Sequence, residues 1–414
     1  MAIVRPFKGL RPTPELAGQV ASPPYDVLSV EEARVMAANN PISFLRVNKA
    51  ELELEPGMDP YSEQVYQRSK ANLDRLYSHG TMIRDNEPAY YLYRLTWRGQ
   101  SQTGLVALTS VDEYNRGIIK KHEHIRPVKM EDRANHIEHL QAQVGPVFLT
   151  FKQTEEVATM FERVTMNIPD VDFTAVDDVR HELWVMSDAT KIVALEKFFA
   201  RVETLYIADG HHRSAAASEI SRRFNEANPG APADDPHNYF LSVIFPADEL
   251  RILPYNRVIK DLNGMTLEQV LEKAAEKWDV TKSDGEVIPE QHHEVGLYSG
   301  KRWYRLTARP GSFDADSPTK SIDAAILGDN FIDPILGISD PRKDDRIDFV
   351  GGIRGNAELV KLVDSGDYAL AFSMYPTSIE QLLSVADADE VMPPKSTWFE
   401  PKLRSGMVVN LLSD

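Results

Sequence analysis

The chain has 414 residues, with 46 Lys and Arg against 63 Asp and Glu, which gives a formal net charge of −17. Hydrophobic residues make up 42% and charged residues 26% of the chain, and this ordinary composition excludes wholesale disorder and collagen-like repeats. The length suggests two domains, or one large domain with appendages. The acidic balance argues against nucleic acid as a partner, because binding a phosphate backbone needs local positive charge. The lack of cysteine excludes thiolate nucleophiles, Cys-ligated zinc and disulfides.

Targeting and membrane signals are not evident in the sequence. The amino-terminal residues contain no apolar core of a signal peptide. The longest apolar runs fall far short of the ~18–20 residues that span a bilayer. We therefore expect a cytoplasmic protein that does not contact membranes.

Hydrophobic periodicity predicts an alternation of strands and helices after a proline-rich, extended segment over residues 1–30. Taken in chain order, the helices are expected over 30–40, 60–78, 130–144, 192–199, 211–224, 267–278, 357–363 and 379–385. Strands are expected over 90–97, 103–111, 182–186, 204–208, 239–245, 251–258, 296–299 and 303–307.

Several neighbouring strands are predicted to pair as hairpins, among them 239–245 with 251–258. Helices mixed with hairpins favour an α+β fold with mixed sheets over a regular doubly wound sheet. The pattern of apolar and polar residues changes after about residue 260. We place the domain boundary there, with a first domain over 1–260 and a second over 261–414.

The most informative stretch is LYIADGHHRSAAA, residues 205–217, in which an apolar strand runs into Asp209 and Gly210 and a helix opens directly afterwards. Glycine lets the backbone turn sharply, and the N–H groups of a first helical turn attract anions. The residues that would surround a bound phosphate here are Gly210, His211, His212, Arg213 and Ser214. We expect a phosphate cradle, in which removal of Arg213 weakens phosphate binding and leaves stability unchanged or slightly raised. The alternative is a capped helix with surface histidines.

A second cluster spans residues 120–133 and holds five Lys or Arg residues, two His and three carboxylates in fourteen positions. Such a mixture suits a polyanion pocket in which Glu123 accepts a proton. Two alternatives stay open. One is a solvated loop and helix start with mixed charges, and the other is a zinc site built from His122 and His124 with the histidines of 211–212.

Two proline-fixed turns complete the candidate residues. SPPYDV, residues 22–27, presents Tyr25 and Asp26, and MPPKSTWFEPKL, residues 392–403, presents a further set of polar side chains. We expect the following to line a substrate site, with packing as the alternative for both turns: Tyr25, Asp26, His122, Lys395, Ser396 and Thr397.

These motifs together resemble a bacterial and archaeal family of proteins of unknown function, the domain-of-unknown-function family one-thousand-fifteen. The resemblance rests on SPPYDV, on the HE…K…DR block that starts at His122, on YIADGHHR at 206–213, and on 392–403. The DGHHR box is also similar to the phosphate-binding box of the ParB/sulfiredoxin superfamily, which includes nucleotide-dependent free-serine kinases. The sequence departs from the family pattern at 124–126, where a Lys-Thr pair is common.

The resemblance implies a ParB/sulfiredoxin-like core that binds ATP or ADP with Mg²⁺ at the DGHHR box. By this resemblance the leading expectation is an enzyme, a small-molecule kinase that phosphorylates free L-serine to O-phosphoserine. Glu123 would accept the hydroxyl proton, Lys129 and Arg133 would neutralise developing charge, and Asp209, or alternatively Asp26, would hold the metal.

Two other functions stay open at this stage. One is a nucleotide-binding regulatory switch without turnover of a small molecule, and the other is a metal-dependent phosphatase that uses the histidines. The expected partners are a nucleotide and a small-molecule substrate. The oligomeric state is open, with a homodimer as one option.

Overall fold

The structure is a computed structural model that describes residues 2–152 and 154–413. Contacts between Cα atoms divide the chain into two compact units. Unit 1 contains residues 1–121, 125–250 and 401–414, and unit 2 contains residues 122–124 and 251–400. The boundary expected near residue 260 stays a prediction about independently folding domains. Among the residues described, the longest apolar helices are too short or too polar to cross a membrane.

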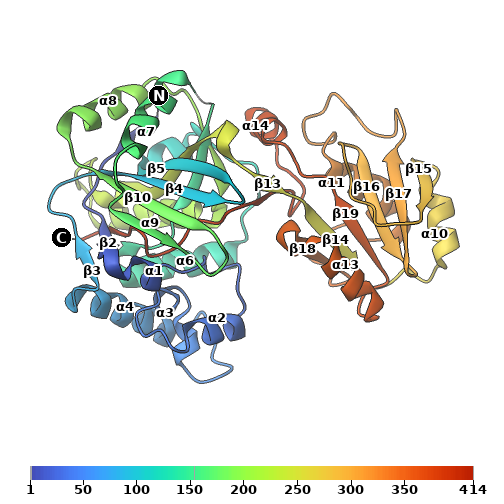
Figure 1. Cartoon of the computed structure of the whole chain (residues 1–414), viewed down its shortest axis with the longest axis horizontal. Helices are drawn as coiled ribbons and strands as arrows, with labels where there is room; N and C mark the ends of the chain where they lie inside the picture. Colours follow the sequence, from blue (N-terminus) through green and yellow to red (C-terminus); the bar gives the residue numbers. More distant parts are fainter. Residues whose placement is uncertain (1, 153, 414) are drawn as a thin grey trace. The chain divides into compact units, whose positions relative to one another are not determined.

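Unit 1 is built on a nine-stranded sheet of order β6-β11-β8-β12-β5-β4-β10-β9, with β1 paired to β5 (Figure 1). Most neighbours are antiparallel, and β11 with β6 and β12 with β8 are parallel. The sheet strands are β1 (Val4–Arg5), β4 (Tyr90–Trp97), β5 (Gln100–Ser110), β6 (Ile119–Lys120), β8 (Val147–Phe151), β9 (Val171–Thr174), β10 (Arg180–Met186), β11 (Leu205–Asp209) and β12 (Tyr239–Pro246). Two small pairs join β2 (Leu10–Pro12) to β3 (Met82–Arg84) and β7 (Ala142–Gln143) to β21 (Asn410–Leu411).

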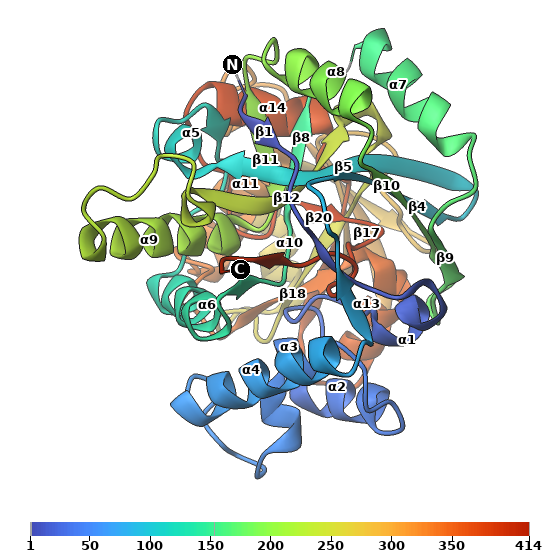
Figure 2. The ribbon, with the colours of Figure 1, turned by 90° about the vertical axis from the view of Figure 1, so that its left-hand side faces the viewer.

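The helices of unit 1 pack either on this sheet or on one another, and some of them share one apolar cluster with its strands. They are α1 (Ala17–Val20), α2 (Val30–Ala37), α3 (Leu45–Asn48), α4 (Glu63–Ser78), α5 (Val111–Asn115), α6 (Pro127–Leu140), α7 (Glu155–Thr165), α8 (Ala189–Phe199) and α9 (His211–Ala227). Figure 2 shows α7 and α8 on one side of the sheet and α6 on the other. Alternate residues of β11, Leu205 and Ile207, pack with Phe198 and Phe199 of α8 in one buried cluster.

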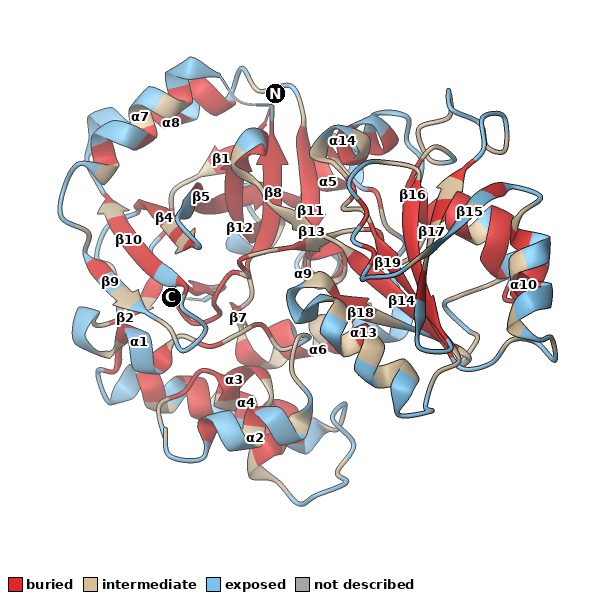
Figure 3. Ribbon diagram, turned by 45° about the vertical axis from the view of Figure 1, so that its right-hand side comes forward, coloured by how far each residue is buried: buried red, intermediate tan, exposed pale blue. Residues whose placement is uncertain are grey.

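Unit 2 is a six-stranded antiparallel sheet of order β15-β17-β16-β19-β14-β18, with β13 and β20 as a separate pair. Its strands are β13 (Ile252–Leu253), β14 (Tyr255–Ile259), β15 (Trp278–Ser283), β16 (Glu294–Ser299), β17 (Arg302–Ala308), β18 (Ile347–Gly351), β19 (Leu370–Met374) and β20 (Trp398–Phe399). Its helices are α10 (Leu267–Ala274), α11 (Asp323–Leu327), α12 (Asp333–Leu336), α13 (Gly355–Asp364) and α14 (Ile379–Asp387). Figure 3 colours the central strands of both sheets as mostly buried.

The predicted α+β class with mixed sheets is confirmed. The predicted hairpin of 239–245 with 251–258 is wrong, because β12 pairs with β5 and β8 whereas β14 pairs with β18 and β19. A short 3-10 turn over Ala247–Glu249 follows β12 in place of a two-residue hairpin turn. The helix expected over 267–278 ends at Ala274, and the fully buried Trp278 begins β15.

Candidate functional site

The junction of β11 and α9 has the geometry that its sequence predicts. The first four residues of β11 are buried, and Gly210 follows the strand with a φ of +103°. An added Cβ at Gly210 would lie 3.1 Å from the guanidinium carbon of Arg213, so both the left-handed backbone and the close side chain require glycine. The first turn of α9 then begins at His211. We call residues 209–214 the phosphate turn.

Asp209 lies at the end of β11 between two cations. Its Oδ2 is 3.3 Å from Lys402 Nζ and 3.7 Å from Arg213 Nη2, and its side chain is 31% exposed. Burial alone would raise the pKa of Asp209, but Lys402 and Arg213 outweigh burial and hold that pKa well below its ordinary range. Asp209 is therefore ionised at neutral pH.

Arg213 is bound within the fold and is not a free surface cation. Its Nη1 donates to the carbonyl oxygen of Pro146, and its side chain is only 14% exposed. Together with the ion pair to Asp209, this contact gives Arg213 a structural role beside any role in binding phosphate. The expectation that its loss leaves stability unchanged or raised has to be revised, because the variant would lose both contacts.

The two histidines of the phosphate turn differ in environment. His211 is buried at 4% exposure. His212 is half-buried, and its Nε2 accepts a hydrogen bond of 2.9 Å from the backbone N–H of Arg126. An accepting Nε2 carries no proton, so His212 is neutral in this arrangement and its remaining proton is on Nδ1. His212 therefore adds no positive charge at the start of the helix.

Ser214 is fully buried, and its hydroxyl donates to the carbonyl oxygen of His211 at 3.1 Å. The backbone N–H groups of Arg213 and Ser214 both donate to the carbonyl oxygen of Gly210, at 2.9 and 3.0 Å. These contacts fix the first turn of α9. Binding of phosphate by the Ser214 hydroxyl stays a prediction.

Helix α6 carries two of the expected cations, one mostly buried and one exposed. Arg133 is 13% exposed, its Nη2 lies 2.6 Å from Asp132 Oδ2, and its guanidinium stacks 4.1 Å from the ring centre of Tyr25. Asp132 also accepts a hydrogen bond of 3.0 Å from the Tyr66 hydroxyl. Lys129 is exposed near the start of the helix. Arg133 is therefore preorganised by its contacts with Asp132 and Tyr25.

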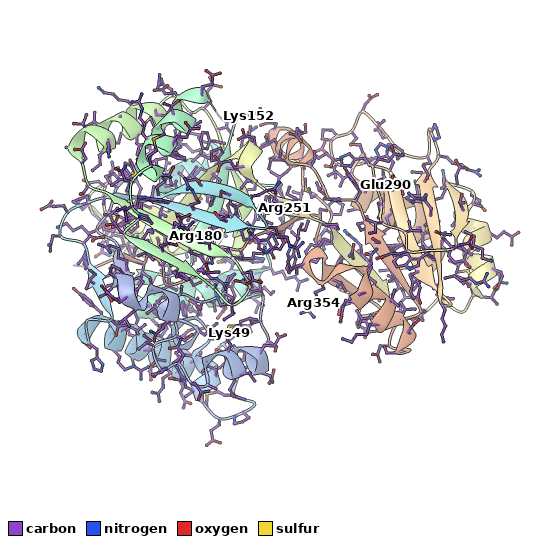
Figure 4. All side chains as sticks on the ribbon, viewed as in Figure 1. Lys49, Lys152, Arg180, Arg251, Glu290 and Arg354 are labelled. Atoms are coloured by element: carbon purple, nitrogen blue, oxygen red, sulfur yellow. The ribbon has the colours of Figure 1, made fainter. Side chains whose placement is uncertain are left out.

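The proline-fixed turn near the amino terminus presents Tyr25 half-buried and Asp26 exposed. Lys49 Nζ donates to the carbonyl oxygen of Tyr25 over 3.4 Å, and Figure 4 labels Lys49 beside the amino-terminal helices. Burial raises the pKa of Tyr25 to about 12, even though Arg133 acts in the opposite direction. Its phenol is thus neutral at physiological pH and can donate a hydrogen bond.

One cavity in unit 1 brings three of the predicted residues together. Tyr25, Arg133 and Arg213 all line it, although they come from the amino-terminal turn, α6 and α9. Its volume is about 40 Å³. The residues predicted from the motifs at 22–27, 122–133 and 206–213 thus converge in part on one place.

The remaining predicted residues belong to unit 2, which is described by itself. There the backbone N–H of Met392 donates to the carbonyl oxygen of His122 at 2.9 Å, so the segments 122–124 and 392–397 lie together. His122 is buried, Glu123 and Thr397 are half-buried, and Lys395 is exposed. The Ser396 hydroxyl donates to the carbonyl oxygen of Pro393 at 2.7 Å. The roles of Glu123, His122, Lys395, Ser396 and Thr397 stay predictions.

The zinc alternative finds no support in the part of the chain that the structure describes. Within that part, no three His, Asp or Glu side chains gather closely enough to hold a metal ion. A magnesium site asks less of the protein, because Mg²⁺ is commonly held by one or two carboxylates together with substrate phosphates. The ionised Asp209 fits that requirement.

Lys402 is a site residue that the sequence reasoning did not select. Lys402 lies inside the motif at 392–403, so its residue type was visible in the sequence. The site residues predicted from that motif were Lys395, Ser396 and Thr397. The chain passes from unit 2 back to unit 1 at residue 401, one residue before Lys402. Only the fold shows which part of the motif reaches Asp209.

Comparisons with known proteins agree with the motifs. A family model described as "Protein of unknown function (DUF1015)" matches residues 4–325. No curated protein matches the chain.

Several solved structures are similar to this chain at a low level. A variant of a free serine kinase in complex with AMP is 14% identical with a TM-score of 0.36, covering 71% of this chain and 87% of that chain. A conserved hypothetical protein from Pyrococcus furiosus is 15% identical with a TM-score of 0.36, covering 74% and 95%. SbnI with a C-terminal truncation from Staphylococcus aureus is 13% identical with a TM-score of 0.39, covering 74% and 87%. TM-scores this low transfer no activity to this chain.

Proposed function

The chain belongs to the DUF1015 family of proteins of unknown function, and from the geometry of its own site we propose that it is a nucleotide-dependent small-molecule kinase. ATP or ADP, with Mg²⁺, is the phosphoryl donor, and a small hydroxyl compound is the acceptor, with free L-serine as the first candidate. Unit 1 is the ParB/sulfiredoxin-like core that binds the nucleotide.

The observation that carries this proposal is the phosphate turn itself. A buried strand, a left-handed glycine and the amino end of a 17-residue helix follow one another directly. The positive end of the helix dipole and its first N–H groups attract an anion. Lys402 and Arg213 add two positive charges against the single charge of Asp209. The excess charge of these groups is positive, and a nucleotide's phosphates would balance it.

Asp209 has two contributions in this proposal. In the free protein it keeps Lys402 and Arg213 in place. When nucleotide binds, Asp209 would hold Mg²⁺, which would offset the negative charge of the phosphate groups. The lowered pKa of Asp209 keeps its carboxylate available as a metal ligand across the neutral range.

Phosphoryl transfer asks a protein mainly for positioning and for stabilisation of charge on the transferred group. We assign charge stabilisation to Arg133 and Lys129, both on α6. Arg133 is held in place by Asp132 and Tyr25, which is the preorganisation that this role needs. Glu123 is assigned as the base that accepts the hydroxyl proton, and this assignment rests on the sequence motif.

The experiment that tests the proposal is a turnover assay with product identification. The full chain is incubated with Mg²⁺, with ATP or ADP, and with L-serine or a panel of other hydroxyl compounds. Phosphorus NMR then detects the phosphorylated acceptor, and O-phosphoserine is the product expected with serine. Nucleotide binding without any transfer to the panel would contradict the kinase proposal and would favour the regulatory switch. Absence of nucleotide binding would contradict both.

A further inference from the structure

The small cavity beside the phosphate turn has walls that come entirely from unit 1. Its volume of about 40 Å³ is far below the ~300 Å³ at which pockets for whole organic ligands begin. One water needs about 10–15 Å³ of such space, so the cavity has room for a group of about three waters, such as a carboxylate. It can hold one polar group of a ligand and cannot hold a nucleotide.

The electrostatics of the wall favour a negative group. Among the described lining residues, the charged side chains are Arg133 and Arg213, and both are cations. His136 also lines the cavity, and burial with Arg133 beside it lowers the pKa of His136 to about 3, so it is neutral. Two guanidinium groups at one small cavity repel each other, and an anion between them would turn that repulsion into attraction.

The wall also contains a hydrogen-bond donor whose partner is not among the described residues. Asn48, the last residue of α3, lines the cavity at 6% exposure, and its buried Nδ2 has no hydrogen-bond partner in the described chain. Leaving a buried donor unpaired costs about 1–3 kcal/mol. Because Asn48 lines the cavity, a rotation of its side chain would bring this donor onto an acceptor oxygen bound there.

The two guanidinium groups keep donor capacity beyond their contacts within the fold. Arg133 uses Nε and Nη2 on Asp132, and Arg213 uses Nη1 on the carbonyl oxygen of Pro146. Each guanidinium has five N–H donors in a planar fork that matches a carboxylate. Together with Asn48, the wall is rich in donors and matches a group with two acceptor oxygens.

We propose that this cavity binds the carboxylate of the acceptor substrate, and that the acceptor is a small hydroxy acid, a class that includes hydroxy amino acids. The assignment as acceptor site rests on the proposed function of the phosphate turn. Arg213 links the two sites, because it lines the cavity and also lies against Gly210 and Asp209. An acid anchored by its carboxylate in the cavity extends its hydroxyl group toward the bound nucleotide.

The test compares three small compounds on the full chain by isothermal titration, with and without ADP and Mg²⁺. L-serine and glycerate have both a carboxylate and a hydroxyl group, whereas ethanolamine keeps the hydroxyl and amine of serine without the carboxylate. One charge-assisted hydrogen bond is worth ~1.5–3 kcal/mol, so both acids should bind at least about tenfold more tightly than ethanolamine. Ethanolamine binding as tightly as serine would overturn the proposal.

Variants at Asn48 test whether the acids bind in this cavity. Asn48→Asp adds a negative charge to the wall and should weaken binding of both acids by about tenfold or more, by the same arithmetic. Asn86→Asp adds the same charge at an exposed turn and should leave their binding unchanged. Unchanged acid binding in a folded Asn48→Asp variant would contradict the site. If that variant does not fold, the comparison of serine with ethanolamine on the unmodified chain decides.

The two proposals can fail separately in this experiment. If ADP binds and neither acid does, the carboxylate site is wrong and the nucleotide site stands. If the acids bind through Asn48 and ADP does not bind, the proposed kinase function is wrong, and the cavity is a carboxylate site without an acceptor role.

Discussion

Lys402 Nζ lies 3.3 Å from Asp209 Oδ2, and 193 residues of sequence separate the two side chains. The carboxy-terminal segment makes this contact because other bonds hold it in unit 1. Arg404 Nη2 lies 2.5 Å from Asp177 Oδ2, and the backbones of Val409 and Leu10 exchange hydrogen bonds of 2.8 and 2.9 Å. The phosphate turn is thus completed by a residue from the end of the chain.

Lys402→Ala should weaken nucleotide binding. The variant removes one of the two cations at Asp209, and a charge-assisted contact to phosphate is worth ~1.5–3 kcal/mol, or about 10- to 150-fold in the dissociation constant for ADP. Titration calorimetry with ADP and Mg²⁺ measures the change. Lys197→Ala, at an exposed position of α8, is the matched control and should bind as the unmodified chain does. Equal affinity in the Lys402 and Lys197 variants would remove Lys402 from the site.

Gly210→Ala should lower both stability and nucleotide affinity. Alanine in a left-handed conformation costs ~1–2 kcal/mol, and its Cβ would also displace the Arg213 guanidinium. Gly230→Ala separates these effects, since Gly230 has a φ of +98° with nothing within 4 Å of an added Cβ. Both variants should lose stability in urea unfolding, Gly210→Ala the more of the two because Arg213 is also disturbed, and only Gly210→Ala should lose affinity for ADP. A parallel loss of affinity in both would mean that the turn has no special part in binding.

Arg213→Ala should reduce stability and nucleotide affinity together. The variant loses the contacts to Asp209 and to the carbonyl oxygen of Pro146, and one such bond to a charged group contributes about 1.5–3 kcal/mol. Arg213→Lys keeps the positive charge without the planar fork, so it should recover part of the stability and less of the affinity. Thermal unfolding and ADP titration of both variants give the two quantities. Full affinity for ADP in a destabilised Arg213→Ala variant would mean that Arg213 is only structural.

Stability should fall as the pH decreases below about 6.5, through two buried histidines. Burial, with Arg133 nearby, lowers the pKa of His136 to about 3, and burial with Arg404 nearby lowers the pKa of His181 to about 3. The unfolded chain takes up these protons near pH 6.5 and the folded chain does not. Each histidine therefore reduces the free energy of unfolding by up to about 1.4 kcal/mol per pH unit between pH 6.5 and 3.

Urea unfolding at pH 7 and pH 5 measures this dependence. His136→Gln and His181→Gln should each reduce the loss of stability between the two pH values, even if they lower stability at pH 7. Exposed His79→Gln is the control and should leave the pH dependence unchanged. The same loss in all variants would show that carboxylates cause it.

Local patterns predicted the elements that carry the phosphate turn. The strand ending at Asp209, the turn at Gly210 and the helix that follows depend on neighbouring residues, so their sequence was sufficient. The apolar run over 239–245 indicated a strand just as clearly, but the partners of that strand were not predictable, because pairing depends on distant strands. Glu249, just past that strand, accepts the backbone N–H of Thr103 at 2.5 Å and so fixes the chain by a contact 146 residues away.

The chemical state of the site also lay beyond the sequence. The motif alone suggests that His212 is a cation. In the fold, its Nε2 accepts a hydrogen bond from the backbone N–H of Arg126, so the ring is neutral. The motif alone suggests that Arg213 binds phosphate. In the fold, its Nη1 also donates to the carbonyl oxygen of Pro146, and this contact is structural. Motifs gave the residue types, whereas charge and orientation depend on partners that the fold supplies.

The most direct test of the phosphate turn is a crystal structure of the full chain with ADP and Mg²⁺. We expect the phosphate groups to lie at the amino end of α9, within hydrogen-bond distance of the backbone N–H groups of residues 211 and 212, with Lys402 and Arg213 beside them and Mg²⁺ on Asp209. ADP bound at any other place, with residues 209–214 unchanged and Lys402 still paired with Asp209, would contradict it.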